Sequence, residues 1–375
     1  MPDETQIGYR PTWAEVDLAN LADNFRKVSL SISPKIKILV TEKADAYGHG
    51  LIPVSRKLAS LGVDFLGVAS IDEGVKLRQA GITTPVLILG VVLEKDIPPI
   101  VKFGLTPTVC DEKSAVAFNR LAKKAGIKLN VHVKVDTGMG RIGVQYKDAL
   151  KLLRKISRLP AIRIEGIFTH FPLADVNRQF TSAQIRLFNQ LMLDLKESGI
   201  VIPLVHAANS VGLTDYQDSH FTMVRPGLVI YGLYPKENLK IKLKPVLVLK
   251  SRVVFVKNVP KGFGVSYSHA YVTKRPGCIV TLPIGYGDGY PRNLSNKAFV
   301  LIGGRRFKIS GKICMDQVMV DVGSYKARVG EEAVLIGKQN KAEVTVEELA
   351  KLSGTIPYEI SCGLGSRIPR VYIRP

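Results

Sequence analysis

The chain has 375 residues, of which 46% are hydrophobic and 23% are charged, as in ordinary globular proteins. This length predicts two or three domains, and no apolar run is long enough to span a membrane. The formal net charge of +21 fits either a phosphate-rich partner such as nucleic acid or a basic surface facing solvent. Because the lysines and arginines are spread along the chain, we favour the basic surface and expect no nucleic-acid partner.

The N-terminal stretch MPDETQIGYRPTWAEVD is polar where a secretory signal requires apolar residues, so we expect a cytoplasmic protein. Cys110, Cys278, Cys314 and Cys362 form no CxxC pair, and neither a zinc site nor any other metal site is expected. Disulfides are not expected in a cytoplasmic protein. We therefore predict four reduced thiols, most of them buried.

Short apolar segments alternate with helical segments between residues 36 and 231. The predicted strands span 36–43, 63–69, 85–90, 104–109, 129–135, 163–169, 202–206 and 222–225. The clearest helix runs from Thr181 to Ser198, and Thr181 with Gln184 forms a capping-box pattern at its start. Eight strands alternating with helices favour an α/β fold, a (β/α)8 barrel of the TIM type. An open doubly wound sheet is the alternative, but no GxGxxG sequence follows any strand.

The pattern changes after residue 235. KENLKIKLKP (236–245) resembles a linker, and strand-like segments follow at 246–259, 278–285, 298–304, 317–323 and 332–337. The one clear helical signal in this part lies at 345–354. We predict an N-terminal barrel over residues 10–235 and a mostly β C-terminal domain over residues 245–375.

Polar and ionisable residues follow several of the predicted barrel strands. They are Lys43 and Tyr47 after the first strand, Arg141 after the fifth, His170 after the sixth, His206, Asn209 and Ser210 after the seventh, and Arg225, Gly227 and Leu228 after the eighth. Barrels of this type carry their catalytic groups at this end of the strands. A solvated lysine or a structural histidine explains each residue alone, but not their placement together at one rim.

The loops after the seventh and eighth strands are where such barrels often bind phosphate. Ser210 offers a hydroxyl there, and Gly227 and Leu228 offer backbone N–H groups. A phosphate site beside a rim lysine suits pyridoxal 5′-phosphate, whose aldehyde forms a Schiff base with a lysine amine. The pattern indicates Lys43 as that lysine.

Eight short segments resemble those of bacterial alanine racemases from near residue 10 to the C-terminus. They are KADAYGHG (43–50), KVDTGMGR (134–141), THF (169–171), HAANS (206–210), MVRPG (223–227), VSY (265–267), IGYGDGYPR (284–292) and ICMDQ (313–317). Each is short, but all eight occur in the family's order. The resemblance implies a barrel followed by a β domain, and an isomerase that interconverts L- and D-alanine with pyridoxal 5′-phosphate and supplies D-alanine for peptidoglycan.

The resemblance also implies two catalytic bases. Lys43 would carry the cofactor and act on one face of the substrate, and Tyr267 would act on the other face from the second subunit of a homodimer. Cofactor contacts are implied or expected for Lys43, Tyr47, His170, Asn209, Ser210, Arg225, Gly227 and Leu228, with Arg225 facing the pyridine nitrogen. Substrate contacts are implied for Arg141 and Met315, and supporting roles for Lys134, His206, Tyr286 and Asp316. Lys134 matches a lysine that is carbamylated in some members and positions the arginine.

Three positions depart from the family's pattern. Glu42 stands where an apolar residue is usual, Lys312 where an arginine is common, and Ser366 where some members have a phosphate-binding tyrosine. Because successive strand residues face opposite ways, Glu42 should point away from Lys43 toward the helix layer. An unpaired buried charge is unfavourable, so we expect Glu42 to have a partner or some exposure.

Other functions remain open at this point. A racemase for serine, for lysine or for a broader set of amino acids has the same motifs. A non-enzymatic pyridoxal phosphate carrier resembles the barrel alone, and the β domain with Tyr267 disfavours it. A decarboxylase of the related barrel-plus-β-domain type is disfavoured by the ordered racemase segments.

Overall fold

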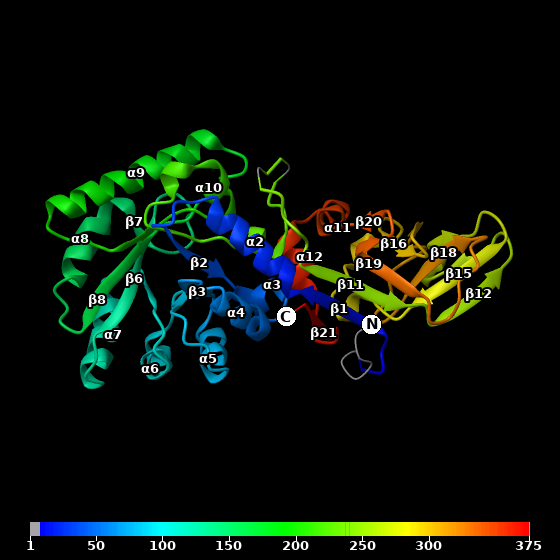
Figure 1. The fold of residues 1–375 in the computed structure, drawn as a ribbon, viewed down its shortest axis with the longest axis horizontal. Coiled ribbons are helices and arrows are strands. Elements are labelled where there is room, and N and C mark those ends of the chain that lie inside the picture. The colour runs from blue at the N-terminus through cyan, green and yellow to red at the C-terminus, as the bar shows by residue number, and fades with distance from the viewer. Residues whose placement is uncertain (1–7, 237, 240, 375) are drawn as a thin grey trace.

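The computed structural model describes residues 8–236, 238–239 and 241–374, and has two parts arranged end to end (Figure 1). Residues 1–7 of the polar N-terminal stretch and residues 237 and 240 of the predicted linker lie outside the described residues. One part is a ring of parallel strands surrounded by helices, and the other consists mostly of strands. The predicted fold class is confirmed.

All eight predicted barrel strands are present. In chain order they are β2 (Lys37–Thr41), β3 (Phe65–Val68), β4 (Val86–Ile88), β5 (Thr108–Val109), β6 (Leu129–Asp136), β8 (Ile162–Phe168), β9 (Leu204–His206) and β10 (Met223–Val224). Hydrogen-bonded neighbours follow the order β4-β3-β2-β10-β9-β8-β6-β5, and the short strand β7 (Val144–Gln145) adds to β6. A parallel bridge between Leu87 and Thr106 joins the two ends of this order, so the ring is nearly closed.

Helices cover the outside of the ring. They include α4 (Leu51–Ser60), α5 (Ile71–Gln79), α6 (Ile97–Lys102), α7 (Glu112–Lys124), α8 (Tyr146–Ile156) and α9 (Arg178–Glu197). Each buries one face; α8, for example, buries Ala149, Leu152, Leu153 and Ile156 at helical spacing. Burial of these apolar stripes against the strands holds the outer layer in place.

The predicted capping box at the start of α9 is wrong. The helix begins at Arg178, and the Asn177 side chain accepts the N–H of Phe180 as its N-cap. Thr181 and Gln184 lie inside the helix and are buried. Asparagine is as good a cap as threonine, and it stands one turn earlier. Gln184 instead donates to Thr137 Oγ1 at 3.0 Å, beneath the loop after β6.

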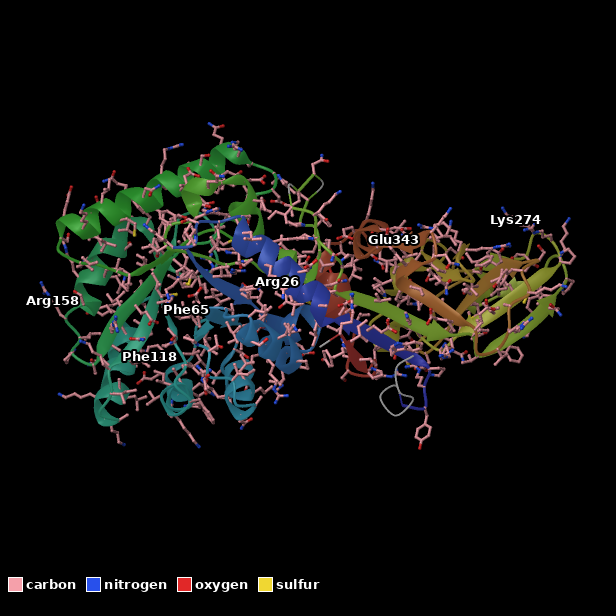
Figure 2. The ribbon with its side chains drawn as sticks, in the orientation of Figure 1. Arg26, Phe65, Phe118, Arg158, Lys274 and Glu343 are labelled. Atoms are coloured by element: carbon pink, nitrogen blue, oxygen red, sulfur yellow. The ribbon has the colours of Figure 1, made fainter. Side chains whose placement is uncertain are left out.

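The interior of the ring is divided between apolar and polar side chains. Leu39, Phe65, Leu87, Leu204 and Met223 form an apolar cluster of their own, separate from the main core. Figure 2 shows Phe65 and Phe118 within the barrel half, and Lys274 at the far end of the second domain. The buried polar residues His132, Lys134 and His206 come from β6 and β9.

Most strand pairs of the second domain are antiparallel, and the domain is built mainly from short strands, as predicted. They are β11 (Leu247–Arg252), β12 (Phe255–Val259), β13 (Gly264–Val265), β14 (Tyr271–Val272), β15 (Gly277–Leu282), β16 (Phe299–Ile302), β17 (Arg305–Lys308), β18 (Val318–Gly323), β19 (Glu332–Gln339), β20 (Ala342–Val344) and β21 (Arg370–Ile373). The predicted helix is α11 (Val346–Ser353), and a second helix, α12 (Pro357–Gly363), follows it.

The first strand of the chain belongs to the sheet of the second domain. β1 (Thr12–Asp17) pairs antiparallel with β11 and parallel with β21. The prediction that residues from 10 onward belong to the barrel is therefore wrong for this strand, because the sequence of a strand does not show which strands it pairs with. Asp17 then caps α2 (Leu18–Leu30), which leads the chain into the barrel (Figure 1).

Two further expectations concern membranes and thiols. No helix among the described residues is long and apolar enough to cross a membrane. The four cysteines are free thiols, as predicted. Only Cys278 is buried, however, so the prediction that most of them are buried is wrong.

Candidate active site

A cavity of about 220 Å³ lies at the C-terminal ends of the barrel strands. Ten predicted residues line it, namely Lys43, Tyr47, Lys134, Arg141, His170, Asn209, Ser210, Arg225, Gly227 and Leu228. The structure therefore brings together residues that are spread over most of the barrel sequence. Thr41, Leu89, Phe168 and Tyr358 complete the lining and were not predicted.

Lys43 begins α3 (Lys43–Gly48), a short turn with an unusual backbone. Residues 44–47 have φ values between 53° and 55°, in the left-handed region. This conformation costs about 1–2 kcal/mol for each L-residue, so contacts from outside must hold the turn. Glu73 Oε1 accepts the Ala44 N–H at 2.7 Å, and Glu73 Oε2 accepts the Ala69 N–H at 2.8 Å. The strain begins directly after Lys43, the residue predicted to carry the cofactor, and strained backbone is common at functional sites.

The helix α12 of the second domain packs against this turn. A Cβ at Gly48 would lie only 2.1 Å from the Ser361 carbonyl oxygen, so glycine permits the close approach. The ring of Tyr358 lies 5.7 Å from that of Tyr47 and forms part of the cavity wall. Ser366 is exposed and does not line the cavity. The second domain therefore supplies a phenol here through Tyr358, whose pKa burial raises to about 12.

Tyr47, Ser210 and Gly227 form a small cradle on one side of the cavity. The Gly227 N–H donates to Ser210 Oγ at 3.1 Å, and a Cβ at Gly227 would lie 2.8 Å from Tyr47 Oη. Asn209 caps the turn that begins at Ser210 by accepting the Gly212 N–H at 2.9 Å. The hydroxyls of Tyr47 and Ser210 and the backbone of Gly227 thus surround a space that only glycine leaves open. This arrangement fits the phosphate of pyridoxal 5′-phosphate.

Arg225 is buried beneath the cavity and uses its N–H groups in several directions. Nη2 donates to the carbonyl oxygens of Thr169 at 2.7 Å and Ala207 at 3.0 Å. Nη1 lies 3.0 Å from His206 Nδ1, and Nη2 lies 3.4 Å from His170 Nδ1. Burial lowers the pKa of Arg225 to about 9, so the guanidinium remains protonated at neutral pH.

The two histidines beside Arg225 are neutral. Burial lowers the pKa of both His170 and His206 well below the usual range, and the charge of Arg225 adds to this effect. A neutral imidazole accepts through one nitrogen and donates through the other. Each ring therefore accepts from the guanidinium through Nδ1 and keeps its proton on Nε2. His206 does not line the cavity but supports it from below.

The surroundings of both predicted lysines of the cavity lower their pKa values. Burial, followed by the charge of Arg141, lowers the pKa of Lys43. Burial, followed by the charges of Arg225 and Arg141, lowers the pKa of Lys134 to about 7. About half of Lys134 is then neutral at pH 7. Neutral amines are the reactive forms toward an aldehyde or carbon dioxide.

Glu42 faces away from the cavity, as expected. Its side chain is fully buried against α4, and Oε2 accepts the Ser55 hydroxyl at 2.6 Å. Oε1 has no hydrogen-bond partner among the described residues. Burial raises the pKa of Glu42 to about 8, so the side chain is mainly a neutral acid at pH 7. Of the two predicted alternatives, Glu42 has a hydrogen-bond partner and is not exposed.

Four predicted residues lie together on the second domain and do not line this cavity. We call Tyr267, Tyr286, Met315 and Asp316 the second-domain cluster. Tyr267 is 66% exposed, Met315 53% and Tyr286 41%. The segment 312–316 joins them, because Lys312 O accepts the Ser266 hydroxyl at 2.6 Å and Cys314 O accepts the Tyr286 N–H at 3.0 Å. Large side chains thus face outward, and none of the four residues lines the cavity that contains Lys43 of the same chain.

Lys312 is anchored beside Tyr267. Its Nζ donates to Ser268 Oγ at 3.1 Å, and Ser268 is one of the two left-handed residues that flank the tyrosine, with Ser266 as the other. Lys312, which stands where an arginine is common in the family, therefore stabilises the strained turn that carries Tyr267.

Comparisons with known proteins agree with this geometry. The family model of the alanine racemase N-terminal domain matches residues 16–235, and that of the C-terminal domain matches residues 246–372. The alanine racemase of Halothermothrix orenii is 46% identical over 97% of both chains, and that of Methanococcus maripaludis is 40% identical over 97% of this chain and 99% of the relative. The alanine racemase structure from Clostridium difficile 630 superposes with a TM-score of 0.92 at 40% identity, covering 97% and 96% of the two chains.

The barrel with its lysine-bearing cavity, the β domain and these matches together indicate an enzyme of the isomerase class, a racemase. The chain belongs to the alanine racemase family.

Proposed function

We propose that this protein interconverts L-alanine and D-alanine in the cytoplasm, uses pyridoxal 5′-phosphate, and supplies D-alanine for peptidoglycan. The observation that carries the proposal is the cavity in which Lys43 faces the cradle of Tyr47, Ser210 and Gly227. The relatives named above, which are alanine racemases, support the choice of substrate. A Bacillus anthracis alanine racemase structure with bound L-Ala-P, 35% identical with a TM-score of 0.92 over 98% of this chain and 96% of that one, supports it further.

The residues of the cavity suit the cofactor at both of its ends. Lys43 Nζ would hold it covalently, and Tyr47, Ser210, Gly227 and Leu228 would hold its phosphate, with Asn209 fixing the turn. When bound, the cofactor withdraws electrons from the substrate's α-carbon and makes the α-proton acidic. Arg225 would donate a hydrogen bond to the pyridine nitrogen and keep its own proton, since a guanidinium does not act as an acid here.

Racemisation requires proton transfer on both faces of the α-carbon. Lys43 Nζ would remove or return the proton on one face. The phenol oxygen of Tyr267 would do the same on the opposite face, and His170 Nε2–H would hold that oxygen in place through the chain that begins at Arg225. Arg141 and the Met315 backbone would bind the substrate carboxylate, and Lys134, when carbamylated, would position Arg141.

The site requires a homodimer in this proposal. Tyr267 and Met315 belong to the second-domain cluster, which is exposed and does not reach the cavity of its own chain. A second copy that presents its cluster to this cavity would bring the two bases together and cover the exposed side chains of both copies. Tyr286 and Asp316 would support that contact.

The test is a racemase assay on the purified protein with alanine, serine and lysine. We expect clear preference for alanine; a higher kcat/KM for serine or lysine would support the alternative specificity. Lys43→Ala should abolish the absorption band of the covalently bound cofactor. Tyr267→Phe should keep the band and lose most turnover, with proton removal from one enantiomer affected most. Full activity in either variant would contradict the mechanism.

A further inference from the structure

A line of polar side chains runs through the barrel interior, from beneath the cavity toward the other end of the strands. Arg225 Nη1 lies 3.0 Å from His206 Nδ1, and His206 Nε2 lies 2.9 Å from His132 Nδ1. His132 Nε2 then lies 3.4 Å from Glu165 Oε2, a long contact, and makes no closer hydrogen bond among the described residues. Asn130 Nδ2 donates to the same carboxylate at 2.8 Å. Apolar side chains usually fill such barrels, so this line calls for an explanation.

The backbone of β6 and β8 is shaped to hold His132 and Glu165 together. Along these strands Val131 pairs with Ile164 but His132 pairs with Gly166, so Glu165 is the extra residue of a bulge. Bulges commonly turn a side chain to a new direction. A Cβ at Gly166 would lie 2.5 Å from atoms of the His132 ring, so glycine makes room for that ring. The bulge and the glycine are two independent features that serve the same contact.

The arginine dictates where the two rings carry their protons. A guanidinium only donates, so His206 must accept through Nδ1 and donate from Nε2 to His132 Nδ1. The proton of His132 then lies on Nε2 and faces Glu165. With the opposite tautomers, His206 Nδ1–H would face an N–H of Arg225 Nη1, and the two donors would have no acceptor between them. The line therefore has a direction, with a cation at one end and a carboxylate at the other.

We propose that Glu165 is a positioning residue of the active site, which acts through His132 and His206 to orient the Arg225 guanidinium. Glu165 Oε2, 3.4 Å from His132 Nε2, places a negative charge beside that proton and so favours the same tautomers as the arginine. His206 is the partner of Nη1, whereas backbone carbonyls hold Nη2. This inference rests on the proposed function, since it matters for catalysis only if Arg225 faces the cofactor.

The first test determines which ring nitrogens carry protons, from spectra of cofactor-free protein labelled with ¹⁵N in its six histidines. Wild-type spectra should show a protonated Nε2 and a bare Nδ1 at both His132 and His206, with signals assigned by replacing each histidine in turn. Glu165→Gln should shift the signal of His132 Nε2, because its proton then faces a neutral amide, and change the signal of His206. A proton on Nδ1 of either ring in wild type, or unchanged spectra in Glu165→Gln, would overturn the proposal.

The second test uses the holoenzyme and a matched control. Glu165→Gln should lower kcat about tenfold, the effect of one hydrogen bond to a charged group, and leave KM and cofactor affinity unchanged. The control is Glu15→Gln, because Glu15 is a buried strand carboxylate that pairs with Lys250 in the second domain. It should keep both the wild-type kcat and the histidine spectra. Equal losses in both variants would indicate general destabilisation and refute the positioning role.

The two tests separate this inference from the proposed function. If the wild-type protein neither binds pyridoxal phosphate nor racemises alanine, the proposed function fails. The spectra of cofactor-free protein still decide whether Glu165 acts on the two histidine rings.

Discussion

Glu42 and Lys43 are adjacent in sequence and lie on opposite sides of the barrel wall. Lys43 lines the cavity, whereas Glu42 is fully buried against Ser55 on the helix side. A residue that faces the reaction and one that faces the outer core are thus one peptide bond apart. Any change of charge on Glu42 acts directly on the backbone that carries Lys43.

The first prediction concerns the stability of the fold against pH. The pKa of Glu42 rises from 4.5 to about 8 in the folded protein, so between these values the folded chain binds one proton more than the unfolded chain. Stability should therefore fall with rising pH, by about 1.4 kcal/mol per unit from this group, and level off above pH 8. Glu42→Gln should gain roughly 2 kcal/mol over wild type between pH 6 and pH 8 in urea unfolding.

The control for this experiment is Ser55→Ala, which removes the partner hydroxyl and keeps the carboxyl group. The stability of Ser55→Ala should still fall with rising pH. A Glu42→Gln profile parallel to that of wild type would show that Glu42 does not titrate in this window.

The second prediction concerns Lys134. Carbon dioxide adds to a neutral amine and releases a proton, and the pKa of Lys134 is about 7 because of burial and the charges of Arg225 and Arg141. Incubation with ¹³C-bicarbonate should give a carbamate signal that grows as pH rises through 7. Lys134→Arg should show no carbamate signal. Its kcat/KM should fall about tenfold, since Arg141 loses its anionic neighbour. A carbamate signal that survives in Lys134→Arg would assign it to another amine.

The third prediction tests whether active sites are shared between subunits. Lys43→Ala and Tyr267→Phe should each be inactive alone. In mixed dimers, one of the two sites regains both Lys43 and Tyr267. Random pairing makes half the dimers mixed, so activity should return to about a quarter of the wild-type value. If both bases came from the same chain, mixing would restore nothing.

The fourth prediction concerns the phenol that the second domain supplies. Tyr358 lines the cavity beside Tyr47, while Ser366 does not reach it. Tyr358→Phe should weaken pyridoxal phosphate binding about threefold to tenfold in a spectroscopic titration, as expected for one lost neutral hydrogen bond. Tyr325→Phe removes a phenol that pairs with Glu331 far from the cavity, and should leave the affinity unchanged. If Tyr358→Phe bound pyridoxal phosphate as tightly as wild type, the Tyr358 ring would contribute only packing.

The sequence predicted the rim of the barrel well because strand ends and short motifs are local features. Lys43, His170 and Arg225 each follow a strand that its apolar pattern reveals, and parallel strands bring their ends together. His132 could have been found the same way, since it stands two residues before Lys134 on β6 and therefore on the same face.

Other parts of the site depend on features that the sequence does not display. Glu165 reaches His132 only because of a bulge, which shifts the strand register by one residue. Tyr358 comes from the second domain, and its place at the cavity follows from how α12 packs on α3. The left-handed backbone at residues 44–47 contains no glycine that would have signalled it.

The pairing of β1 sets an order for how the protein is made. Trp13 and Val16 on this strand are almost completely buried, between β11 and β21. A ribosome releases these residues before either partner strand, since β11 begins at residue 247 and β21 at residue 370. The strand must therefore wait, with its apolar side chains uncovered, until both partners have been synthesised. A fragment that stops near residue 235 keeps β1 without its partners, so a truncated barrel exposes the apolar side chains of this strand.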